Sequence, residues 1–395
     1  MDYTKIKAIF YYFDKMSVDD ILWGLLEMGI DVALGSLKAE INYIVDEQVE
    51  SIKNEIQEYD YVITQNFSTN VALACHEKEK KYISWIYDSP QVALYTDHAL
   101  YDTNFVFAFD KKQVERLKEI GLKHVFYQPL AANIAKIEHM QIPRSDYSKY
   151  NADVSFVGQL YQKDYFDEFV SKLPEAVGRE ILDICNQKAL SWGKGSNIFN
   201  SVSDESVPII CKDMNQSDFA YFHMMDHKYS AEVLLSGPYI SQIDRIRVLE
   251  RTAEKYKTCL YTRESDLEIA SKISGLKVCG PAKGDETYKV YYASKLNLNL
   301  TMRTIETGVP QRVFDIMGVG GAVISNRQDE MEELFVPDKE IILFESVEEY
   351  LDKVSFYLYN GKARRKIAEN GKKRVEREYN YLCSLNSMFD KVENA

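Results

Sequence analysis

The sequence has no long hydrophobic run. No apolar stretch among its 395 residues approaches the roughly 18 residues that a membrane-spanning helix requires. The first residues, MDYTKIKAIFYYFDK, lack the layout of a signal peptide, because their short apolar run ends at Asp14 and Lys15. These two absences predict a soluble, cytoplasmic protein.

Cysteine is sparse and scattered. The chain has six cysteines, no two of them closer than 20 residues, so it contains no CxxC pair. This spacing argues against a zinc knuckle or a dithiol redox motif. It favours isolated thiols buried in a reducing compartment.

The chain also has fewer basic than acidic residues. The 48 basic residues face 61 acidic ones, a net charge of -13 at pH 7, and no local basic stripe compensates. A nucleic-acid backbone is therefore excluded as an expected partner, and anionic lipid surfaces are disfavoured.

The common nucleotide-binding and metal-binding motifs are missing. The chain has no GxxxxGK[ST] loop, and its GVGG stretch at 318–321 follows a helical pattern instead of opening one, so it is no dinucleotide fingerprint. An NAD-dependent oxidoreductase is disfavoured for that reason. His223 and His227 stand four residues apart but without HExxH, and we expect no metal site there.

Short apolar runs alternate with helical patterns, which predicts an α/β protein with largely parallel sheets. Strands are expected at 7–13, 61–64, 82–87, 105–109, 125–128, 153–158, 259–262, 277–279, 322–325 and 341–344. Residues 142–151 are polar and turn-rich and predict a domain boundary. Residues 164–257 have weak, mostly helical patterning, and the chain ends in helices.

The segment 292–326, YASKLNLNLTMRTIETGVPQRVFDIMGVGGAVISN, carries the strongest chemical signal. A short helix is expected to begin after Pro310, and its N-terminus would be a seat for phosphate. Arg312 in the first turn could clamp a diphosphate, and Asp315 on the same side could accept hydrogen bonds from sugar or ribose hydroxyls. Gly320 and Gly321 would let the backbone pass close to a ligand. An ordinary helix with a surface Arg–Asp pair and a glycine turn remains the alternative.

The first half offers candidates for binding an acceptor. Asp88 ends an expected strand, where ligand sites of open α/β sheets lie, and could act as a general base. A turn-capping role before Ser-Pro is the alternative. Asp97 and His98 could also reach such a site. Tyr12 and Asp14 end the first strand at the same edge, where an ordinary strand-terminal turn is the favoured interpretation.

Several of these stretches resemble the CgeB-like glycosyltransferases, a family named for a spore-maturation protein. The similar segments are NLNLTMRTIETGVPQRVFDIMGVGGAVISN, ELFVPDKEIILFESVEEY, ISWIYDSP and DVSFVGQLYQKDYF, within roughly residues 60–390. The resemblance implies a GT-B fold with two facing Rossmann-like domains. Residues 1–150 would bind the acceptor, residues 151–378 the nucleotide sugar, and the helix at 379–395 would cross back onto the first domain.

The resemblance also implies site residues. Arg312 matches the arginine of a G-x-P-x-R pattern that would neutralise the diphosphate, and Asp315 stands where relatives hold the ribose with a glutamate. A second glutamate of those relatives corresponds to Thr307 here, with Glu306 beside it. The shorter Asp315 and the missing glutamate are departures from the pattern.

Further donor-side residues follow from the same comparison. Lys295, Asn297 and Asn299 match an S-K-x-N-x-N stretch that would face the cleft, and Lys295 would help Arg312 to stabilise the diphosphate. Gly158 and Gln159 occupy the first strand-to-helix turn of the donor domain.

The sequence therefore predicts an enzyme that transfers a sugar from a nucleotide diphosphate, with UDP as the expected nucleotide. No cofactor or metal is expected beyond the nucleotide-sugar co-substrate. The acceptor would be a protein, a glycan or a component of a cell surface, spore or flagellum. The alternative is a catalytically inactive GT-B scaffold that binds a glycan or a protein partner.

Overall fold

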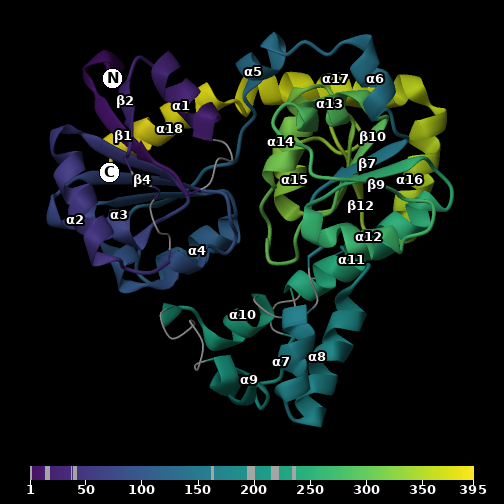
Figure 1. Ribbon diagram of the computed structural model, residues 1–395, viewed down its shortest axis with the longest axis horizontal. Coiled ribbons are helices and arrows are strands. Elements are labelled where there is room, and N and C mark those ends of the chain that lie inside the picture. Colours follow the sequence, from purple (N-terminus) through teal and green to yellow (C-terminus); the bar gives the residue numbers. More distant parts are fainter. Residues whose placement is uncertain are drawn as a thin grey trace.

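The computed structural model describes residues 2–13, 18–36, 38, 42–161, 164–193, 201–214, 222–233 and 237–395. Two parallel α/β units lie side by side, and a helical lobe lies beneath them in Figure 1. The predicted α/β class with parallel sheets is thereby confirmed. None of the helices in these ranges is long and apolar enough to cross a lipid bilayer.

The first sheet has six parallel strands in the order β2-β1-β3-β4-β5-β6. Strands β3 and β5 are buried along their whole length, and β1 and β4 at every residue but the first, which is why these strands can be recognised as continuous apolar runs. The edge strand β2 is half exposed and has no such run, so the sequence did not reveal it. The strands are β1 Lys7–Tyr11, β2 Asp31–Leu34, β3 Tyr61–Gln65, β4 Lys81–Ile86, β5 Asn104–Ala108 and β6 Val125–Tyr127.

Helices cover both faces of this sheet, with α18 from the end of the chain among them (Figure 1). The side chains of Ser68 and Asp110 cap α3 and α4 by accepting hydrogen bonds from first-turn N–H groups. The helices are α1 Val18–Glu27, α2 Asp46–Glu55, α3 Thr69–Glu77, α4 Lys111–Glu119 and α18 Tyr381–Glu393.

The last helix, α18, returns to the first sheet through specific contacts. Its Tyr381 ring packs against Trp85 of β4 with ring centroids 5.4 Å apart. Glu393 at its end accepts a hydrogen bond from the Tyr61 hydroxyl and forms an ion pair with Lys81, 2.8 Å away. The chain therefore ends on the half in which it began.

The second sheet is also parallel, in the order β12-β11-β10-β7-β8-β9. Its strands are β7 Val154–Val157, β8 Thr258–Tyr261, β9 Lys277–Cys279, β10 Leu296–Asn299, β11 Val323–Asn326 and β12 Ile342–Phe344. Its helices are α11 Gly237–Ala253, α12 Leu267–Ser271, α13 Glu286–Ala293, α14 Gln311–Gly318, α15 Asp329–Leu334, α16 Val347–Tyr359 and α17 Gly361–Glu378.

The connection between the sheets differs from the sequence-based prediction of a turn-rich segment at residues 142–151. After α5 (Ile134–His139), the supposedly turn-rich stretch forms helix α6, Arg144–Tyr150. Tertiary contacts with α13 stabilise α6: Lys289 pairs with Asp146 at 2.9 Å, and the Tyr150 hydroxyl donates to Glu286 at 2.6 Å. These contacts stabilise a helix in a segment whose local sequence favours turns only weakly.

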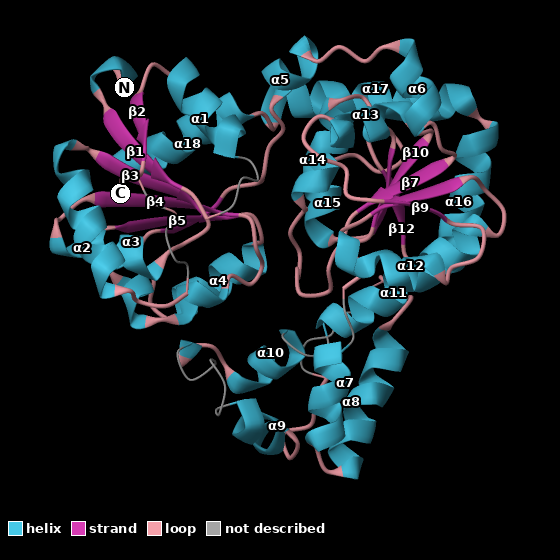
Figure 2. Cartoon of the chain, viewed as in Figure 1, coloured by secondary structure: helices cyan, strands magenta, loops and turns pink. Residues whose placement is uncertain are grey.

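The helical lobe is an insertion between β7 and β8. It contains α7 Asp164–Lys172, α8 Glu175–Lys188, α9 Val207–Met214 and α10 His227–Ala231, and it leads into α11. Figure 2 shows the lobe spanning the space below both sheets. The Phe166 ring stacks on Tyr239 of α11 at 4.1 Å, which joins the lobe to the second unit.

Candidate functional site

A cavity of about 700 Å³ lies between the two sheets. Its walls include loops that follow the carboxyl ends of β4, β7 and β10, the place where ligands of open α/β sheets bind. Four of the predicted site residues line it: Asp88, Asn299, Arg312 and Asp315. The insertion contributes Val233, and α11 contributes Pro238 and Arg245.

Two arginines converge on this cavity. The Arg312 guanidinium lies over the Phe156 ring, 5.0 Å from its centroid, and Nη1 donates to Asn299 Oδ1 at 2.9 Å. Arg245 lies over the same ring at 5.3 Å and donates to the carbonyls of Gln159 and Leu300. Burial lowers the pKa of Arg312, although an arginine remains charged near neutral pH.

Neither arginine forms an ion pair with a carboxylate in the part of the chain that the structure describes. Arg245 is 2% exposed, and its buried Nε finds no hydrogen-bond partner among the described residues. Buried charge that protein groups leave uncompensated favours an anionic ligand. Arg245 could not be predicted as a site residue from the sequence, because this residue lies in the weakly patterned stretch 164–257.

Asp315 is the acidic group of the cavity. Gln311 Nε2 donates to Asp315 Oδ1 at 2.9 Å and also to the Ala131 carbonyl at 2.7 Å. Burial raises the pKa of Asp315 to about 7, and the nearby Asp20 adds to the rise. The carboxyl group therefore changes its charge near neutral pH, when it can switch between donating and accepting a hydrogen bond.

Asp88 lies on the opposite wall, at the carboxyl end of β4. It is exposed, and Asn66 Nδ2 donates to its Oδ2 at 2.8 Å. Asn66 has a positive φ of 60° and accepts from the Tyr87 N–H at 2.7 Å, so it joins the ends of β3 and β4. This arrangement orients a carboxylate at the cavity wall supplied by the first unit.

Four predicted donor residues lie elsewhere. Lys295 precedes β10 and pairs with Asp153 at 2.8 Å, at the amino end of the sheet. Asn297 is buried, where it accepts from Ser155 Oγ at 2.8 Å.

Gly320 and Gly321 precede β11, and hence lie at the amino end as well. A Cβ on Gly321 would come 2.8 Å from Asn297 Nδ2, so this glycine serves packing. Loops that follow a helix reach the amino ends of the strands, opposite the cavity, which is why these residues do not join it.

Among the predicted acceptor residues, Tyr12, Asp97 and His98 do not line the cavity either. Tyr12 is half-buried after β1, and Asp14 lies outside the described residues. Asp97 is 3.3 Å from His223 of the insertion. His98 lies edge-on to Tyr101 at 5.8 Å, and burial lowers its pKa. Asp97 thus connects the first unit to the helical lobe.

The turn at Gly158 and Gln159 contacts both arginines. A Cβ on Gly158 would lie 2.7 Å from Arg312 Nη2, and the Gln159 carbonyl accepts from Arg245. We expect Gly158→Ala to displace the Arg312 guanidinium and to weaken nucleoside diphosphate binding about 10-fold. Isothermal titration calorimetry with UDP checks this, and unchanged affinity would show that the close approach is unimportant.

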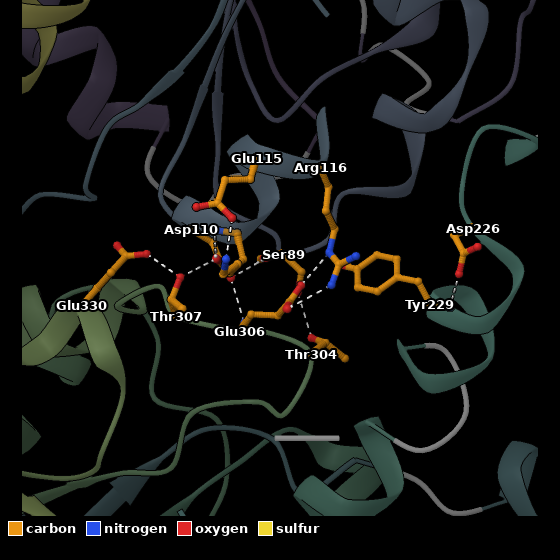
Figure 3. Close-up of polar contacts among 11 residues, drawn as sticks. Ser89, Asp110, Glu115, Arg116, Asp226, Tyr229, Thr304, Glu306, Thr307 and Glu330 are labelled. Atoms are coloured by element: carbon orange, nitrogen blue, oxygen red, sulfur yellow. Dashed lines mark hydrogen bonds and ion pairs between the residues drawn. The ribbon is translucent and has the colours of Figure 1, made fainter. Parts of the chain in front are cut away.

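The loop after β10 departs from the resemblance. Glu306 forms a two-pronged ion pair with Arg116 of α4, at 2.8 and 3.1 Å. Thr307 contacts Asp110 and Glu330, as Figure 3 shows, and does not line the cavity. Neither residue is therefore available to hold a sugar as placed.

Comparison with solved structures shows the same architecture over nearly the whole chain. HepE of Anabaena, in complex with UDP and glucose, is 10% identical, with a TM-score of 0.59 over 99% of this chain and 100% of its own. A glycosyltransferase of Rickettsia africae ESF-5 is 11% identical, with a TM-score of 0.57 over 99% and 100%. Sucrose-phosphate synthase of Thermosynechococcus elongatus is 10% identical, with a TM-score of 0.56 over 98% and 99%.

No curated protein sequence matches the chain. Residues 247–388 match a family model described as glycosyl transferase-like, and this range includes Arg312, Asp315 and five of the six strands of the second sheet. The finer resemblance to the CgeB-like subfamily remains a prediction. The chain therefore has the GT-B fold of glycosyltransferases, and its C-terminal part matches the glycosyl transferase-like family.

Proposed function

We propose that the protein transfers a sugar from a UDP-sugar to a hydroxyl-bearing acceptor at the cavity between the two sheets. The observation that carries this proposal is the pair of arginines at the cavity, the buried Arg245 and the half-buried Arg312, neither of which has a carboxylate partner among the described residues. A diphosphate supplies the missing negative charge. HepE, which shares the fold, was solved with UDP and with UDP-glucose, and this supports the choice of nucleotide.

The arginines would act on the leaving group. When the bond between the anomeric carbon and the diphosphate oxygen breaks, negative charge grows on the diphosphate. Fixed guanidinium groups and the N-terminal end of α14 at Pro310, which lines the cavity, would stabilise that charge. Because the two guanidinium groups supply positive charge, we propose that transfer proceeds without a metal ion.

The two carboxyl groups would have different tasks. Asp315, on the same helix as Arg312, would accept hydrogen bonds from ribose or sugar hydroxyls once it is ionised. Asp88 lies on the wall supplied by the first unit and would orient the acceptor hydroxyl. Its carboxylate would take the hydroxyl proton as the acceptor oxygen bonds to the anomeric carbon and the bond to the diphosphate breaks. Protein, glycan and cell-surface acceptors remain open, with spore and flagellar components among them.

A thermal-shift screen tests the proposal. UDP, GDP, CDP, dTDP and NAD are added separately, each with and without EDTA, and UDP-sugar turnover is then measured with candidate acceptors. We expect UDP to raise the melting temperature, with no change in EDTA, because a ligand that binds only the folded state stabilises it.

Stabilisation by NAD alone, or by no nucleotide, would contradict a UDP-sugar donor. Binding of UDP without any turnover would instead favour the inactive GT-B scaffold. Loss of UDP binding in EDTA would contradict metal independence.

A further inference from the structure

The loop that connects β10 to α14, residues 300–310, meets the first unit at a buried polar junction (Figure 3). The same loop supplies five residues to the cavity wall besides Leu300: Thr301, Met302, Thr304, Ile305 and Pro310. Its attachment therefore decides the shape of one cavity wall. We use the name proton junction for Asp110, Thr307 and Glu330.

Asp110 is the centre of this junction. It is fully buried after β5, and its carboxylate accepts four hydrogen bonds. Lys112 N donates at 3.0 Å from its own helix and Ser89 Oγ at 2.9 Å from the loop after β4. From the cavity loop, Glu306 N donates at 2.8 Å and Thr307 Oγ1 at 2.9 Å. No lysine or arginine pairs with Asp110 within the described ranges.

The contacts of the Thr307 hydroxyl imply that one of the two neighbouring carboxyl groups is protonated. Its Oγ1 lies 2.9 Å from Asp110 Oδ1 and 2.7 Å from Glu330 Oε1. A hydroxyl group has one hydrogen to donate, so it can donate to only one of two carboxylates. Both contacts are hydrogen bonds only when the other carboxyl group carries a proton and donates to Oγ1.

The surroundings assign that proton to Glu330. Apart from Thr307, Asp110 accepts three hydrogen bonds, which favour its ionised form, whereas Glu330 is 1% exposed and accepts one, from Lys111 N. Burial raises the pKa of Glu330 to about 7, and the charge of Asp110 adds to the rise, while the Lys111 N–H, which donates to Glu330 Oε1 at 2.8 Å, opposes it.

The charged groups nearby do not neutralise Glu330. Lys111 Nζ forms an ion pair with Glu333 of the same helix as Glu330. Arg116 is engaged by Glu306 and by the Tyr229 ring of the insertion, 4.0 Å from its Cζ.

We propose that Asp110 and Glu330, sharing one proton through Thr307, are positioning residues that fasten the cavity loop 300–310 to the first unit, and that ionisation of Glu330 releases the loop. The released state has two buried carboxylates with a single hydroxyl hydrogen between them, and they repel each other. The proton passes from the Glu330 carboxyl group to water.

The direction of the pH dependence follows from the raised pKa. The folded junction holds a proton that the unfolded chain would already have lost above the ordinary glutamate value of 4.5. Its stabilisation is therefore complete below that value and disappears as the pH rises through about 7. Alkaline conditions should loosen the cavity loop, and mildly acidic conditions should hold it.

The test compares the full-length protein with Glu330→Gln and, as a matched control on the same helix, Glu332→Gln, because Glu332 pairs with Arg327, whereas Glu333 pairs with Lys111. A glutamine amide donates to Thr307 at every pH and mimics the protonated acid. Infrared spectroscopy reports the carbonyl band of a buried protonated carboxyl group. Hydrogen exchange, corrected with the unfolded peptide at each pH, reports protection of residues 300–310. Neither readout requires a nucleotide, so it stands apart from the proposed transferase activity.

At about pH 6 we expect a protonated-carboxyl band that loses part of its intensity in Glu330→Gln and is unchanged in Glu332→Gln, relative to the wild-type protein; Asp315, whose pKa is also raised to about 7, contributes the remainder. Protection of residues 300–310 should fall about 10-fold between about pH 6 and pH 8.5 in the wild-type protein and in Glu332→Gln, and stay constant in Glu330→Gln. An undiminished band, or an equal fall in protection, in Glu330→Gln would overturn the proposal. Should Glu330→Gln fail to fold, Thr307→Val serves instead: it is expected to lower protection already at about pH 6, and full protection there would equally contradict the junction.

Discussion

Replacing Arg312 with alanine is expected to weaken UDP binding about 100-fold, because a charged hydrogen-bond donor to a diphosphate contributes about 1.5–3 kcal/mol and each 1.4 kcal/mol is tenfold in affinity. Arg312 lines the cavity, and its known protein partners are Asn299 and the face of Phe156. Alanine therefore removes the charge without leaving a carboxylate unpaired. Isothermal titration calorimetry with UDP measures the loss.

Two further variants sharpen this result. Arg312→Lys keeps a point charge but loses the planar fork, so it should recover only part of the affinity. Arg247→Ala is the matched control, since Arg247 pairs with Glu250 on the surface of α11 and does not line the cavity. If Arg312→Ala bound UDP as the wild type does, the nucleotide would lie elsewhere.

Asp244→Ala should destabilise the protein by about 3–5 kcal/mol, because it leaves a buried arginine without its counter-charge. Asp244 and Arg303 are almost fully buried, 2.6 Å apart at Arg303 Nε, and join α11 to the cavity loop. Asp244 also accepts from the Leu190 N–H at 2.7 Å. Trp192, one of the three tryptophans of the chain, lies 5.1 Å from the Arg303 guanidinium, so fluorescence-monitored urea unfolding includes a signal from this region.

The control for this prediction lies directly after the same helix. Glu254 is 3.8 Å from Arg251, and both side chains are largely exposed. Exposed pairs contribute at most about 1 kcal/mol, so Glu254→Ala should leave the unfolding midpoint nearly unchanged. Equal midpoints for Asp244→Ala and Glu254→Ala would show that the buried ion pair is unimportant for stability.

Much of the fold is predictable from the sequence because parallel strands buried on both faces are continuous apolar runs. Strands β1, β3, β4, β5 and β6 are recognisable in this way. The edge strand β2 and helix α6 are not, because β2 is half exposed and α6 is stabilised by Lys289 and Glu286 of α13. Elements that depend on distant partners have a weak local pattern.

The candidate site likewise contains residues that the sequence predicted and lacks others that it predicted. Arg312, Asp315, Asn299 and Asp88 line the cavity as the sequence suggested, since each follows or faces the carboxyl end of a strand. Lys295 precedes its strand, so the direction of the chain already placed it at the amino end of the sheet. The position of Lys295 before its strand therefore argues against a place at the cavity, whereas the family resemblance argues for one.

The class of the fold and the position of Arg312 and Asp315 on the helix after Pro310 follow from the amino-acid sequence alone. Strand periodicity, helix starts and local spacing are properties of neighbouring residues, and so they can be recognised in the sequence. The meeting of Arg245 with Arg312 at the cavity, and of Thr307 with Asp110 and Glu330, depends on tertiary contacts. Both arrangements unite residues from elements far apart in the chain, and their chemistry arises from burial and shared hydrogen bonds that sequence spacing does not encode.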